Sequence, residues 1–115
     1  MFSNMNPKSP LPKEKKLTVI FRVEEGCLGP DGAQHVEGFC KFAQKEVETI
    51  DADFVHWIVV PRHDKALVET EYNINEKKLT HDKAERYLNL FEKSLDEFEG
   101  HFHEKISLLI EDYLH

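Results

Sequence analysis

The thiol and imidazole groups in the first third of the chain are the most versatile side chains for chemistry. Cys27, His35 and Cys40 are separated by seven and four intervening residues. Zinc prefers such ligands, but structural zinc sites usually contain two cysteines only about two to four residues apart. That pair is absent here, and Cys40 falls on an apolar helical stripe, where a cysteine behaves as a small hydrophobe. We therefore predict no metal site, and these three residues are the candidate ligands should one exist.

Cys27 is also the candidate nucleophile of a catalytic hypothesis. It precedes the predicted start of a helix, where the positive end of the helix dipole favours a thiolate. A base would be needed nearby, and the candidates are His35, His56 and His63. The weak catalytic candidates of this hypothesis are Cys27, His35, His63 and Asp64. The sequence contains no cysteine-enzyme signature, P-loop, Rossmann glycine pattern, nucleophile-elbow serine or H-E-x-x-H motif. The sequence thus argues against an enzyme and predicts no cofactor.

The densest polar cluster is "PRHDK", residues 61–65, which follows an apolar strand. Arg62 could hold an anion, and carboxylates could hold a hard cation. The candidate ligand-binding set is therefore Arg62, His63, Asp64, Glu69 and Glu71. A solvated hairpin loop is the simpler interpretation, because loops at the surface are commonly charged.

Periodicity predicts the elements that would position these groups. Alternating apolar residues predict strands over 17–24 and 67–74, and residues 54–60 are apolar on both faces, which is typical of a central strand. Apolar residues at three- and four-residue spacings predict helices over about 36–50 and 81–114, the second capped by Thr80. The stretch "EEGCLGPDGAQH" is then the corner between the first strand and helix, with Asp31 and Gln34 as a capping box.

This order predicts a βαββα chain of the α+β class. A right-handed crossover makes the first two strands parallel, and the third runs antiparallel to them. The expected fold is a three-stranded mixed sheet with two helices, a truncated ferredoxin-like plait with a long C-terminal helix. Residues 1–15, with prolines and lysines, are predicted to be a flexible tail, and residues 16–115 a single domain.

The length of the last helix bears on assembly. A continuous helix over 81–114 is about 50 Å long, but a domain of this size has a radius of gyration of only about 13 Å. Either the helix breaks at Gly100 and folds back, or its far half packs on another chain. A three-stranded sheet with one other helix also leaves Trp57 or Phe54 poorly covered. Both arguments favour a homodimer formed through the C-terminal helix and the open sheet face.

Charge and composition narrow the class of partner. The net charge is −7, and residues 1–16 carry four lysines against one glutamate, so the rest of the chain is strongly acidic. Nucleic-acid binding needs a basic face, which argues against such a partner. No apolar run is long enough for a signal peptide or a membrane span. The expected location is the cytoplasm, with Cys27 and Cys40 reduced.

These observations predict a soluble, non-enzymatic, homodimeric binding or regulatory module for a protein or small-ligand partner. The alternative is a small enzyme, or a metal- or anion-binding protein, that uses the loops after the first two strands. Parallel strands would bring both loops to one edge of the sheet, where binding sites of α/β proteins commonly form.

Overall fold

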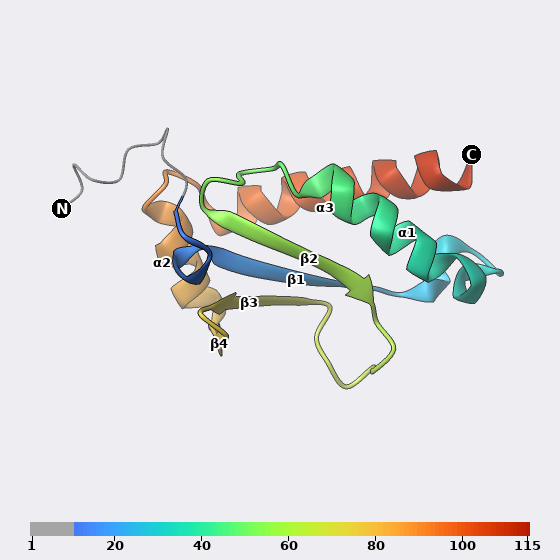
Figure 1. Cartoon of the computed structure of the whole chain (residues 1–115), viewed down its shortest axis with the longest axis horizontal. Helices are drawn as coiled ribbons and strands as arrows, with labels where there is room; N and C mark the ends of the chain where they lie inside the picture. The colour runs from blue at the N-terminus through green and yellow to red at the C-terminus, as the bar shows by residue number, and fades with distance from the viewer. Residues whose placement is uncertain (1–10) are drawn as a thin grey trace.

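The computed structural model describes residues 11–115. Its strands and helices are β1 (Leu17–Val23), α1 (Gly32–Val47), β2 (Val55–Pro61), β3 (Thr70–Ile74), β4 (Lys77–Lys78), α2 (His81–Asn89) and α3 (Leu95–Leu114). Two short 3-10 helices, η2 (Lys13–Lys15) and η3 (Glu25–Leu28), flank β1. The chain belongs to the α+β class, as predicted, and measures 51 × 28 × 23 Å (Figure 1).

The sheet is mixed and has the strand order β2-β1-β3-β4. As predicted, β1 is parallel to β2 and antiparallel to β3. The predicted number of three strands is wrong, because the two residues Lys77 and Lys78 add a short fourth strand beside β3. The central position expected for β2 is also wrong, since β2 lies at the edge of the sheet and β1 lies inside it.

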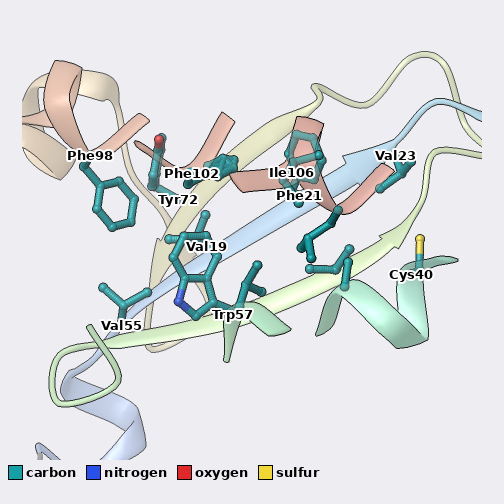
Figure 2. Close-up of a cluster of buried hydrophobic side chains, with 14 of the residues drawn as sticks. Val19, Phe21, Val23, Cys40, Val55, Trp57, Tyr72, Phe98, Phe102 and Ile106 are labelled. Atoms are coloured by element: carbon teal, nitrogen blue, oxygen red, sulfur yellow. The ribbon is translucent and has the colours of Figure 1, made fainter. Parts of the chain in front are cut away.

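One face of the sheet is buried beneath α1 and α3. Alternate residues of β1 and β2 point into this core, and Trp57 is only 2% exposed. Its ring centroid lies 5.5 Å from that of Phe98 and 5.3 Å from that of Phe102, both on α3 (Figure 2). Its indole nitrogen donates a hydrogen bond of 2.8 Å to the Ile50 carbonyl. The expectation that Trp57 is poorly covered is therefore wrong.

The C-terminal region forms two helices with a break at residues 90–94. Glu92 has a φ of 62°, and the Ser94 hydroxyl caps α3 by accepting a 3.0 Å hydrogen bond from the Glu97 amide. Gly100 lies within α3, so both expectations, a continuous helix and a break at Gly100, are wrong. The N-cap signal of Ser94 outweighs the apolar periodicity that runs across the break.

The apolar stripe of α3 is covered by the chain itself. Its buried residues are Leu95, Phe98, Phe102, Ile106 and Leu109. Near the C-terminus, the Tyr113 ring packs on Phe39 and Phe42 of α1, with centroid distances of 5.6 and 5.5 Å. A helix of 20 residues is about 30 Å long and fits along the domain. Helix length therefore no longer argues for a second chain.

The corner after β1 is a close approach of backbone to backbone. A Cβ atom at Gly32 would lie 1.7 Å from the carbonyl oxygen of Glu25, and Gly29 has a φ of 90°. Only glycine fits the first position, and the second favours it strongly. The Asp31 side chain makes no capping bond to α1, so the predicted capping box is wrong. The glycines of this stretch serve a tight corner.

Part of the predicted N-terminal tail contacts the domain. The Leu11 amide donates a 3.0 Å hydrogen bond to the Asp53 carbonyl, and residues 13–15 form η2. The Tyr87 hydroxyl lies 2.9 Å from the carbonyl oxygens of both Lys15 and Phe54. The rest of the predicted tail, residues 1–10, lies outside the described residues.

Candidate functional site

The second face of the sheet carries no helix in the described part of the chain. We call it the open face. Its side chains are half-buried, except those of Asn73, which is buried, and Lys78, which is exposed. The members are Thr18, Ile20, Arg22, His56, Ile58, Val60, Glu71 and Asn73, with Lys78 at the margin on β4.

The open face is apolar where β1 and β2 meet. Ile20 lies directly beside Ile58, and Arg22 lies beside Val60. In the loop after β2, Val68 is 45% exposed, and its carbonyl accepts a 2.7 Å hydrogen bond from the Arg22 guanidinium. Half-buried aliphatic side chains at neighbouring strand positions give the face an apolar centre.

The β3 side of the open face is polar but internally paired. Arg22 and Glu71 form an ion pair of 3.0 Å, and their side chains are only 11% and 16% exposed. The Asn73 amide donates to the other Glu71 oxygen at 3.1 Å. Burial alone raises the pKa of Glu71, but the hydrogen bonds from Asn73 and Arg22 lower it below its ordinary value. Glu71 therefore holds β3 to β1, and its carboxylate has little capacity left for a ligand.

His56 completes the row of the open face that contains Thr18 and Asn73. Burial, and then the positive charges of Lys13 and Lys16, lower the pKa of His56. The imidazole is therefore uncharged at neutral pH. A neutral histidine on this face adds no charge to the surface around Ile58.

The loops after β1 and β2 meet at one edge of the sheet, as their parallel strands predict. The contact is made by Glu24, whose carboxylate pairs with Arg62 and, at 2.5 Å, with the Lys65 ammonium. Hydrogen bonds from Lys65 and Arg62 lower the pKa of Glu24. The prediction of the site residues missed Glu24. The signal that could have found it is a carboxylate directly after β1, on the edge to which "PRHDK" is delivered.

Most of the polar groups in this loop cluster are engaged in holding the loop. The Arg62 guanidinium also donates to the carbonyls of Leu67, at 3.0 Å, and Lys65, at 3.2 Å. Asp64 accepts a 2.9 Å hydrogen bond from the Ala66 amide. His63 and Glu69 are exposed. The structure thus brings Arg62, His63 and Asp64 onto one loop, with Arg62 and Asp64 bonded within it.

The candidate metal ligands Cys27, His35 and Cys40 differ in their environments. Cys27 is exposed in η3, whereas Cys40 is buried on α1, where burial raises the pKa of its thiol to about 12. His35 faces the Tyr113 ring, with centroids 6.4 Å apart. Within residues 11–115, no three His, Cys, Asp or Glu side chains gather as a metal-ligand set. Cys27, His35 and Cys40 therefore do not come together as a set of three metal ligands.

Among the described residues, no helix combines the length and apolarity that crossing a membrane requires. Comparison with protein-family models, with curated proteins and with solved structures gives no match.

Proposed function

We propose that this chain is a non-enzymatic binding module that acts as a homodimer through its open face. The observation that carries the proposal is the one-sided arrangement of the fold. The helices cover one face of the sheet, and Ile20, Ile58 and Val60 remain half-buried on the other. Covering these three side chains with a second copy would remove their remaining apolar surface from water, which is favourable at about 25 cal/mol per Å².

The charge of the open face is compatible with a second copy, although the chain as a whole is acidic. The chain carries a net charge of −7, so two copies repel each other over most of their surfaces. On the open face, Arg22 and Glu71 neutralise each other, His56 is uncharged at neutral pH, and Lys78 adds a positive charge at the margin. The open face therefore does not share the negative charge of the chain. A twofold axis through it would bring together two surfaces that carry little of the negative charge of the chain.

The proposal is tested by placing a charge at the centre of the open face. Ile58→Lys introduces an ammonium group there, and Leu108→Lys is the matched control, since Leu108 is 58% exposed on α3. Sedimentation velocity measures the mass of each variant, and circular dichroism checks folding. We expect Ile58→Lys to be a folded monomer and Leu108→Lys to remain dimeric. Two dimeric variants would contradict the proposed interface.

A ligand site at the loop edge is the second candidate function. The observation that favours it is the meeting of Glu24, Arg62 and Lys65 at the carboxyl ends of β1 and β2. An anion could compete with Glu24 for the two cations, as carboxylates and phosphates commonly do. A thermal-shift titration with inorganic phosphate and divalent metals tests this. We expect phosphate to raise the melting temperature and Lys65→Ala to remove that rise, and no shift with either probe would discard the site.

We also propose a ferredoxin-like arrangement for the fold. Helices on one face of the sheet support a ferredoxin-like plait. The direct pairing of β1 with β2 departs from the split arrangement of that plait, so the relation concerns layers more than strand order. We also propose that the module is cytoplasmic, where an exposed Cys27 would stay reduced.

A further inference from the structure

The outer edge of β2 is a second surface on which two copies could join. β2 is the terminal strand of the sheet, and its seven residues run from Val55 to Pro61. An edge strand presents unpaired amide and carbonyl groups, which are a template for another strand. Because alternate residues point their backbone groups to opposite sides, those of Val55, Trp57 and Val59 face away from β1.

Gln44 of α1 occupies the middle of this edge. Its side-chain nitrogen donates a 2.9 Å hydrogen bond to the Trp57 carbonyl, and its oxygen accepts a 2.8 Å hydrogen bond from the Val59 amide. A side-chain amide has the same donor and acceptor as a peptide group. Gln44 therefore takes the place that one peptide unit of an added strand would take.

Other groups close the two ends of the same edge. The Val55 amide donates to the Asp51 carbonyl at 2.8 Å, and the Leu11 amide donates to the Asp53 carbonyl at 3.0 Å. At the far end, Pro61 has no amide hydrogen to offer. In the middle of the strand, the Trp57 carbonyl and the Val59 amide are therefore bonded by a single side chain, that of Gln44.

The space beside this edge is open on both sides of Gln44. A cavity of about 570 Å³ lies on one side, lined by Cys40, Lys41, Val59 and Pro61 among others. A second cavity of about 250 Å³ lies on the other side, lined by Val55, His56 and Trp57 among others. Gln44 lines both cavities. The helix backbone therefore leaves room along the strand, and the Gln44 side chain crosses that room.

We propose that Gln44 is an edge guard, which prevents β2 of one copy from pairing with β2 of a second copy. A twofold axis at this edge would join two β2 strands in antiparallel fashion into one continuous sheet. The Gln44 amide competes with that pairing for the Trp57 carbonyl and the Val59 amide. This role does not depend on the open face, because the two surfaces lie on different sides of the sheet.

Two variants separate the hydrogen bonds of Gln44 from its volume. Gln44→Ala removes both, and Gln44→Met keeps the length of the side chain but has no amide. Alanine and methionine are good helix formers, so α1 is expected to remain intact. Glu46→Ala, an exposed position on the same helix, is the matched control. Hydrogen exchange of the Val59 amide and light scattering over a range of concentrations are measured for each and compared with wild type.

We expect the Val59 amide of both Gln44 variants to exchange at least about tenfold faster in dilute solution, because a lost hydrogen bond of about 1.4 kcal/mol corresponds to that factor. At higher protein concentration both variants should form larger species than wild type, and Glu46→Ala should not. If Gln44→Ala fails to fold, Gln44→Met decides the question. Folded variants with the mass distribution of wild type would overturn the edge guard, whatever the exchange of Val59.

Discussion

Arg22 and Glu71 form an ion pair across β1 and β3, at 3.0 Å and with side chains only 11% and 16% exposed. The pair lies on the open face of the sheet, and Asn73 donates a further hydrogen bond to Glu71. Both charges are therefore satisfied within the chain. The pair fastens β3 to the interior strand and leaves the open face without a net negative charge.

Replacing Glu71 with glutamine should destabilise the chain at neutral pH by about 1–3 kcal/mol, because the half-buried Arg22 loses its charged partner. The pKa of Glu71 is lowered in the folded chain, so its contribution is fully present above the ordinary value of 4.5 and is lost as the pH falls further. The difference between wild type and Glu71→Gln should therefore shrink from pH 7 towards pH 3. Urea unfolding at several pH values measures it, and a constant difference would contradict the assigned role.

Gly32→Ala should destabilise the corner after β1. Its new Cβ would lie 1.7 Å from the Glu25 carbonyl oxygen, so η3 or the start of α1 has to move. Overpacking of this kind costs about 1–3 kcal/mol. Gly26→Ala is the matched control, because nothing lies within 4 Å of its added Cβ atom. Thermal unfolding of the two variants should separate them, and equal melting temperatures would show that the corner adapts freely.

The two cysteines should react at very different rates with a thiol reagent. Cys27 is exposed, and Cys40 is buried with the pKa of its thiol raised to about 12 by burial. A thiolate is the reactive form, so the folded chain should expose one fast thiol at pH 8, and denaturant should release the second. Cys27→Ser should remove the fast phase. Two fast thiols in the folded wild type would place Cys40 outside the core.

Phe102→Ala should cost about 3–5 kcal/mol, because it leaves a cavity between α3 and the sheet. The Phe102 ring packs against Phe21, at 5.0 Å, and against Trp57, at 5.3 Å. Leu108→Ala, on the exposed side of the same helix, should change the free energy of unfolding by less than about 0.5 kcal/mol.

Removing residues 100–115 should abolish folding, since Phe102, Ile106 and Leu109 leave with them. Cooperative unfolding of that truncated chain would contradict the packing.

Local patterns in the sequence were sufficient to predict the α+β class and the relative directions of β1, β2 and β3. The alternation from Leu17 to Val23 predicts β1, and a right-handed crossover predicts its parallel pairing with β2. The apolar residues on both faces of β2 were misleading, because the open face is aliphatic where β1 and β2 meet, although no helix of residues 11–115 covers it. The break before α3 was missed because apolar spacing continues across it, whereas the Ser94 cap is a weaker signal.

Polar contacts between residues far apart in the sequence could not be predicted from local sequence patterns. Glu24 and Arg62 are 38 residues apart and meet only because β1 and β2 are parallel neighbours. Gln44 and Val59 are 15 residues apart and meet because α1 lies beside the edge of the sheet. A glutamine on the polar side of a helix carries no sequence signal for such a bond. Polar contacts of this kind follow from the arrangement of the elements.

Homodimerisation through the open face can be measured as the molar mass of the wild-type chain in solution. Sedimentation equilibrium is run at pH 7 from about 1 µM to about 1 mM, which brackets the affinities expected for a small interface. A homodimer predicts a mass that rises with concentration to twice the 13.5 kDa of one chain and then stays constant. A mass of one chain at every concentration would contradict it.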